Sequence, residues 1–230
     1  MTADAVGGVW RYALTLAGAL APHGVRTTLA VLGPAPADAQ RADAARVPGL
    51  ELLHGAYPLE WMGDPWDGVA RSGEWLASVA ATLRPDVVHL NGYALADRRW
   101  PAPVLVVAHS CVLSWWEAVR GEDAPPSWAR YRDAVGRGVG AADLVIAPTA
   151  AMLDAVVRHY GAPRTAAVIA NGAEAPAPAT RSKEPIVLSA GRLWDDAKNV
   201  AALDAAAADL AWPVFVAGDA RHAGGGERTL

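Results

Sequence analysis

Cysteine, lysine and phenylalanine are scarce in this chain of 230 residues. It has one cysteine, Cys111, and one phenylalanine, and its only lysines are Lys183 and Lys198. A single cysteine cannot form a disulfide within the chain or supply a cysteine-based zinc site, which suits a reducing compartment. The composition therefore predicts a cytoplasmic protein.

Long hydrophobic runs and clusters of positive charge are also absent. The longest apolar run lies near residues 104–108, far short of the roughly 20 residues that a membrane helix needs. The net charge is −4 and the pI about 5.8, with no stretch that clusters more than two basic residues. We therefore predict no signal peptide, no transmembrane segment and no nucleic-acid partner.

Several signatures of familiar chemistries are missing as well. Neither lysine follows a glycine, so no phosphate-binding P-loop is present. The chain has no G-x-G-x-x-G dinucleotide fingerprint and no G-x-S-x-G elbow of serine hydrolases. No D-x-D triplet occurs, and none of the 6 histidines form a pair at metal-ligand helical spacing. We expect neither a metal site nor a cofactor.

What the chain does have is an alternation of short apolar runs with amphipathic stretches. The apolar runs predict strands at residues 25–32, 50–53, 87–90, 104–108, 144–147, 166–170, 186–190 and 214–217. The periodic stretches predict helices at residues 8–21, 68–83, 127–141, 150–160 and 197–210. This order predicts an α/β fold with a Rossmann-like parallel sheet and helices on both faces.

A segment rich in alanine and proline divides the pattern in two. We predict a first Rossmann-like domain at residues 1–171, a linker at 172–185, and the beginning of a second Rossmann-like domain at 186–230. Few residues precede the first glycine turn, so we expect its strand to be missing, and we expect residues 34–49 to form a loop. About 45 residues after the linker are too few to close a core. The chain therefore reads as truncated at both ends.

Gly7 and Gly8 form a turn where the first helix begins. Bare glycine amides at a helix start favour anionic groups or the close approach of a sugar. A tight turn without a ligand is an equally good interpretation. We take both glycines as candidate substrate-binding residues.

His109 directly follows the apolar run at residues 104–108. It is therefore expected at the carboxyl end of a parallel strand, the edge where open α/β sheets bind ligands. A histidine there can hydrogen-bond a sugar hydroxyl or adjust charge in a transition state. The alternative for His109 is a histidine that only caps the end of the strand. His89, one residue before the end of its own strand, is predicted to be a structural histidine in the core.

Arg192 and Lys198 flank the strand-to-helix turn that begins at Gly191. Arginine offers a planar fork and lysine a point charge, and both can stabilise negative charge on a leaving diphosphate. The alternative of an ordinary surface cation is weaker for Lys198, because this chain almost avoids lysine. Both are candidate catalytic residues.

Five segments together resemble a bacterial family 4 glycosyltransferase. They are A-D-A-V-G-G-V-W at residues 3–10, H-S at 109–110, A-D-L-V-I-A-P-T at 142–149, V-I-A-N-G at 168–172, and A-G-R-L-W-D-D-A-K-N at 190–199. The resemblance implies a GT-B fold, in which two Rossmann-like domains hold a nucleotide-diphosphate sugar and a hydroxyl acceptor. It also implies metal-independent transfer with retention of configuration. In this family Gly7 and Gly8 match the loop near donor and acceptor, His109 the active-site histidine, and Arg192 and Lys198 the diphosphate-binding pair.

The resemblance also defines what this chain lacks. Family members carry a glutamate pair further into the second domain, and the chain ends before that pair, so weak or no turnover is expected. Two alternatives stay open: a sugar-nucleotide epimerase of the same architecture, and a non-catalytic module that binds an acceptor or a partner. A longer parent protein could also contact a membrane peripherally.

Overall fold

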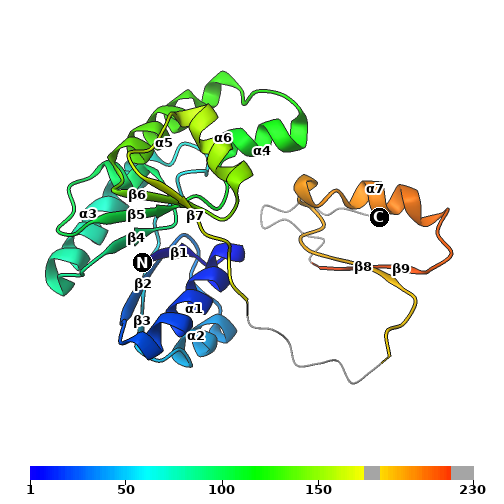
Figure 1. Ribbon diagram of the computed structural model, residues 1–230, viewed down its shortest axis with the longest axis horizontal. Helices are drawn as coiled ribbons and strands as arrows, with labels where there is room; N and C mark the ends of the chain where they lie inside the picture. Colours follow the sequence, from blue (N-terminus) through cyan, green and yellow to red (C-terminus); the bar gives the residue numbers. More distant parts are fainter. Residues whose placement is uncertain (174–181, 219–230) are drawn as a thin grey trace. The chain divides into compact units, whose positions relative to one another are not determined.

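The computed structural model describes residues 1–173 and 182–218, and the chain divides into two compact units (Figure 1). The first unit comprises Met1–Ala118 and Glu122–Ala173. The second comprises Val119–Gly121 and Glu174–Leu230. The described strands all pair in parallel, as the alternation of apolar runs and helices predicts.

The first three strands of the first unit form one sheet in the order β1-β2-β3. These are β1 (Thr2–Asp4), β2 (Thr27–Leu32) and β3 (Leu50–Gly55), with α1 (Gly8–Leu20) and α2 (Asp38–Ala45) between them. The expectation that the first strand is missing is wrong. Three residues suffice because Thr2, Ala3 and Asp4 pair with Ala30, Val31 and Leu32 of the longer β2.

The expectation of a loop at residues 34–49 is also wrong, since α2 lies within it. Its low-complexity sequence carries little helical periodicity, and tertiary contacts stabilise the helix instead. Ala44 is buried, and the side-chain amide of Gln40 donates from Nε2 to the carbonyl oxygen of Ala5 at 2.9 Å. That hydrogen bond ties α2 to the loop that follows β1.

Four further strands form a second sheet in the order β4-β5-β6-β7. The strands are β4 (Val88–Leu90), β5 (Val104–Val107), β6 (Leu144–Ala147) and β7 (Ala166–Val168). The helices of this half are α3 (Trp66–Leu83), α4 (Val112–Trp115), α5 (Ala129–Ala141) and α6 (Ala150–Tyr160). Thr149 caps the start of α6, because its hydroxyl accepts a hydrogen bond from the backbone N–H of Met152 at 3.1 Å.

Strands β1 and β4 join the two sheets side by side. Asn91, directly after β4, donates from its backbone N–H to Oγ1 of Thr2 at 3.0 Å, and from its side-chain nitrogen to the carbonyl oxygen of Thr2 at 2.6 Å. The strands therefore run in the spatial order 3-2-1-4-5-6-7, with the direction of winding reversing between β1 and β4 (Figure 1). Open α/β sheets bind ligands outside the carboxyl ends of the strands at such a switch point.

The first unit has one core cluster around the first sheet and another around the second sheet. Around the second sheet, the strand side chains of Val106 and Val145 pack with Val135 and Val139 of α5, and all four are fully buried. A Cβ on Gly138 would lie 2.0 Å from the carbonyl oxygen of Tyr93. Helix α5 therefore approaches the short 3₁₀ helix Ala94–Asp97 through a glycine, in backbone-to-backbone contact.

The described part of the second unit is small. It contains β8 (Val187–Ala190), the 3₁₀ helix Asp196–Lys198, α7 (Val200–Ala207) and β9 (Val214–Ala217). Leu188 and Phe215 lie opposite each other in the two strands and are 62% and 53% exposed. One face of this two-stranded sheet is therefore apolar and open to solvent.

The fold prediction is confirmed: the chain is α/β with parallel sheets. Within the parts that the structure describes, no helix combines the length and the apolar character needed to cross a membrane.

Candidate active site

The turn predicted at Gly7 and Gly8 connects β1 to α1. Gly7 precedes the first helical residue with φ −150° and ψ −156°, which is extended backbone, and the carboxylate of Asp4 accepts a hydrogen bond from the N–H of Val6 at 2.9 Å. A Cβ on Gly8 would meet nothing within 4 Å. Packing within the described residues thus does not require glycine at position 8, and the space beside it is open to a ligand.

His109 lies two residues beyond β5, at the carboxyl edge where the sequence places it. Its Nε2 is 2.9 Å from the side-chain oxygen of Asn91. Its ring contacts Tyr12 of α1, with the ring centroids 4.4 Å apart. Tyr12 lies one helical turn after Gly8. The position at which α1 begins therefore also determines where the ring of Tyr12 contacts His109.

Asn91 is the residue that sequence reasoning missed. Besides contacting His109, its side-chain oxygen lies 3.2 Å from Nε2 of His89, the histidine predicted to be a structural core residue. One asparagine therefore bridges two imidazoles at the switch point. Its place directly after β4 repeats the place of His109 after β5, and that repetition is the signal from which it could have been found.

Both imidazoles are neutral at pH 7. Burial lowers the pKa of His109 to about 4, and burial is also the main cause that lowers the pKa of His89 to about 4. The site therefore presents uncharged rings that can donate or accept hydrogen bonds, with no cationic imidazolium.

Tyr93 connects the loops that carry Asn91 and His109. Its hydroxyl donates to the carbonyl oxygen of Ser110 at 3.0 Å, and the Glu60 carboxylate accepts the backbone N–H groups of Tyr93 and Ala94 at 3.0 and 2.8 Å. Burial raises the pKa of Glu60, although the two N–H groups lower it in part. Glu60 thus fixes the backbone of the turn after β4. The hydroxyl of Tyr93 in turn fixes Ser110, the residue next to His109.

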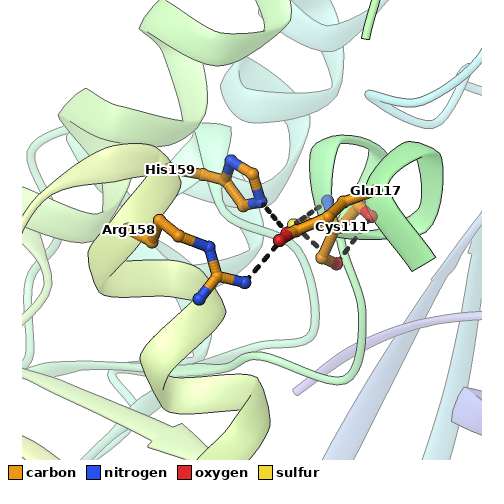
Figure 2. A network of polar contacts seen from close by, with 5 residues as sticks. Cys111, Glu117, Arg158 and His159 are labelled. Carbon is orange, nitrogen blue, oxygen red and sulfur yellow. Dashed lines mark hydrogen bonds and ion pairs between the residues drawn. The ribbon is translucent and has the colours of Figure 1, made fainter. Parts of the chain in front are cut away.

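A second set of contacts holds the segment after His109 (Figure 2). Arg158 and His159 of α6 both point at the carboxylate of Glu117, at 2.8 and 2.9 Å. The two partners lower the pKa of Glu117, with Arg158 the larger cause. Cys111, which is buried, begins α4 by accepting the N–H of Ser114 on its sulfur, so it caps a helix.

Arg192 and Lys198 lie in the second unit, around the turn after β8. A guanidinium nitrogen of Arg192 pairs with the Asp195 carboxylate at 2.7 Å, and the guanidinium lies over the ring of Trp194, 5.1 Å from its centroid. A Cβ on Gly191 would lie 3.4 Å from the aliphatic stem of Lys198. Both cations therefore flank one turn, as the sequence predicts.

The predicted site residues thus form two groups, one in each unit. In the first unit, His109 is joined by Asn91, His89 and Tyr12, none of which was among the predicted site residues. In the second, Arg192 and Lys198 are joined by Asp195. Over the described ranges, no group of three or more histidine, cysteine or acidic side chains is arranged to hold a metal ion.

Residues 6–175 match the model of Glycosyltransferase Family 4. The fold is similar to that in "Crystal structure of LpCGTa in complex with UDP", with a TM-score of 0.53 and 17% sequence identity over 94% of this chain and 69% of that chain. No curated protein matches. The family model spans most of the chain, and the structural likeness supports the expected GT-B type of fold. The chain therefore belongs to glycosyltransferase family 4, as its sequence motifs predict, and its chemistry is glycosyl transfer.

Proposed function

We propose that this protein moves a sugar from a nucleotide-diphosphate sugar to an acceptor hydroxyl, with retention of configuration and without a metal. The observation that carries the proposal is His109, a neutral and partly buried imidazole at the carboxyl edge of the sheet beside the switch point. A neutral ring there suits hydrogen bonding to a sugar, because it adds no charge that the bound sugar would have to balance.

The donor diphosphate is proposed to bind at the turn of Arg192 and Lys198. Arg192 uses one guanidinium nitrogen on Asp195, which leaves further N–H groups of the fork for phosphate oxygens. Lys198 adds a point charge from the other side of Gly191. The structural neighbour is described as a UDP complex, which supports a nucleoside diphosphate as the leaving group here.

In the proposed transfer, the acceptor hydroxyl attacks the anomeric carbon from the face that the diphosphate leaves. The bond from the anomeric carbon to the phosphate oxygen breaks, and the bond to the acceptor oxygen forms. The hydroxyl proton passes to the departing diphosphate oxygen, so Arg192 and Lys198 stabilise the charge that gathers there. These two cations would supply the positive charge that a metal provides in other transferases.

We also propose that turnover is slow. In the described part of the second unit, Leu188 and Phe215 leave one face of the β8–β9 sheet exposed. A turn that follows a sheet packed on one face only holds its ligands loosely, which costs both affinity and orientation. Transfer is expected in the cytoplasm, where the buried thiol of Cys111 stays reduced.

The two alternative functions differ from this proposal in what they require. An epimerase needs a carboxylate available for proton abstraction, whereas the partly buried Glu60 next to the site is committed to the backbone of Tyr93 and Ala94. A module that only binds an acceptor or a partner protein should show no saturable binding of a nucleotide-sugar donor. A titration with such donors therefore distinguishes it from a transferase.

Hydrolysis of a UDP- or GDP-sugar, with water as the acceptor, tests the proposal. Release of nucleoside diphosphate in the presence of EDTA and first appearance of the sugar in the donor's own anomeric configuration support it. Release of the opposite anomer, or release that requires a divalent cation, contradicts retention or metal independence. Arg84 is an exposed arginine at the end of α3. Arg84→Ala is the control for substitutions of Arg192 and Lys198, and it should leave the rate of hydrolysis unchanged.

A further inference from the structure

We infer that Asn91 is a positioning residue that holds His109 in one tautomer. In this tautomer the imidazole of His109 carries its proton on Nε2, and its bare Nδ1 can accept a hydrogen bond from a sugar hydroxyl. The inference rests on the proposed function for the use of that Nδ1. Its geometric part depends only on the contacts of Asn91.

The orientation of the Asn91 side-chain amide follows from Thr2. A backbone carbonyl oxygen can only accept, and one end of the amide lies 2.6 Å from the carbonyl oxygen of Thr2. If the amide were turned over, two acceptor oxygens would face each other at that distance. The nitrogen must therefore point to Thr2, and the oxygen must point toward the histidines.

The tautomers of the two histidines follow from that orientation. Nε2 of His109 and Nε2 of His89 lie 2.9 and 3.2 Å from the Asn91 oxygen. A bare Nε2 would place its lone pair against that oxygen, so each ring must carry hydrogen on Nε2. A neutral imidazole has one N–H, and both rings are neutral at pH 7, so Nδ1 of His109 is unprotonated.

Nδ1 of His109 has no hydrogen-bond partner among residues 1–173 and 182–218, and the ring is held from the side by Tyr12. Nδ1 is therefore a hydrogen-bond acceptor on a ring of fixed orientation, at the carboxyl edge of the sheet where ligands bind. It can accept a hydrogen bond from a hydroxyl group of a sugar. Asn91 acts through His109 in this account, because its own amide is occupied by Thr2 and the two imidazoles.

Nitrogen NMR of the full chain labelled with ¹⁵N-histidine tests the tautomers directly. At pH 7, His89 and His109 should each show a protonated Nε2 and a bare Nδ1. His54 is an internal reference, because its Nε2 lies 3.0 Å from the carbonyl oxygen of Gly33 and does not contact Asn91. His23, which is exposed, reports an unconstrained ring.

Two substitutions of Asn91 complete the experiment. Asn91→Leu removes the acceptor, so His109 should shift toward the tautomer mixture of His23 while His54 is unchanged. Asn91→Asp keeps an oxygen acceptor at Nε2 of both rings, so Nε2–H should persist in both. Its second oxygen faces the carbonyl oxygen of Thr2 without a hydrogen to donate, so this variant should be less stable than the unsubstituted chain. The unsubstituted chain decides the tautomers by itself: a protonated Nδ1 on His109 overturns the inference, whether or not either variant folds.

Kinetics then connect the tautomer to transfer. Asn91→Leu should lower kcat of donor hydrolysis about tenfold, the size of one hydrogen bond, with little change in donor KM. His109→Asn, whose side-chain oxygen occupies the place of Nδ1, should retain more activity than His109→Gln, and the reverse order contradicts the inference. Titration with UDP separates the two failures: absent binding with the expected tautomers refutes the proposed function, whereas binding with a protonated Nδ1 refutes the role of Asn91.

Discussion

The phenol ring of Tyr12 meets the imidazole of His109 edge to face, at an interplanar angle of 72°. Tyr12 lies on α1, whereas His109 follows β5, so the contact joins the two halves of the first unit at the switch point. It covers one side of an imidazole whose low pKa is caused by burial. This relationship makes the protonation of His109 depend on a ring from another element.

We therefore expect Tyr12→Ala to raise the pKa of His109 from about 4 toward its ordinary value, because water would reach the ring. Tyr12→Phe keeps the aromatic face and should leave that pKa near 4. Histidine resonances followed through a pH titration measure both. An unchanged pKa in Tyr12→Ala would show that other groups bury the ring.

The stability of the folded chain should fall as the pH falls from about 6.5 toward 4. Both His89 and His109 have a folded pKa lowered to about 4 from an ordinary value of 6.5, so in this window the unfolded chain binds protons that the folded chain does not. The loss between pH 7 and pH 5 should be roughly 2 kcal/mol for each histidine, and so about 4 kcal/mol for the pair. Urea unfolding at pH 7 and pH 5 measures it. A double variant with His89→Gln and His109→Gln should lose much of the dependence, and equal stability of the unsubstituted chain at both pH values would contradict the account.

Gly138 should tolerate no side chain. A methyl group there would lie 2.0 Å from the Tyr93 carbonyl oxygen, which would force α5 away from the turn that holds Asn91. We expect Gly138→Ala to destabilise the first unit by about 2–4 kcal/mol and to reduce donor hydrolysis.

Gly140 on the same helix is the matched control for that substitution. A Cβ at Gly140 meets nothing within 4 Å, and alanine is favoured over glycine inside a helix. Gly140→Ala should therefore be neutral or stabilise by up to about 1 kcal/mol. Urea midpoints of the two variants make the comparison, and equal midpoints would refute the close approach of α5.

Substitution of Gly8 should separate folding from function. A Cβ at this position enters open space, and alanine suits the first turn of a helix, so Gly8→Ala should keep or slightly raise the melting temperature. If a substrate occupies the space, the same methyl group should raise KM or lower kcat. Thermal unfolding and donor hydrolysis on one preparation measure both, and unchanged kinetics would leave Gly8 with the role of a tight turn.

Much of the fold follows from local sequence pattern. The runs at residues 144–147 and 214–217 coincide with β6 and β9, and Thr149 begins α6 as a capping residue should. Strand β1 and helix α2 do not follow from local sequence pattern. The three residues of β1 are too few to show a periodicity. Helix α2 depends on a hydrogen bond between Gln40 and Ala5, which are far apart in the chain.

The site divides in the same way. His109 was predictable because one strand and its carboxyl end are enough to place it. The place of Asn91 after β4 could have been predicted in the same way, but its contact with Thr2 could not. Tyr12 and Glu60 were not predictable, because each acquires its role from a contact with a distant residue: Tyr12 with His109, and Glu60 with Tyr93. Such pairs depend on how strands β1, β4 and β5 line up, which single-sequence patterns do not encode.

Titration of the chain with UDP- and GDP-sugars in the presence of EDTA tests most directly whether Arg192 and Lys198 bind a donor diphosphate without a metal. We predict saturable binding of at least one donor. Arg192→Lys should weaken it about tenfold, because an ammonium group cannot serve Asp195 and a phosphate with the geometry of the guanidinium fork, and Lys198→Ala should weaken it further. Saturation that survives both substitutions, or no saturation by any nucleotide sugar, would contradict the claim.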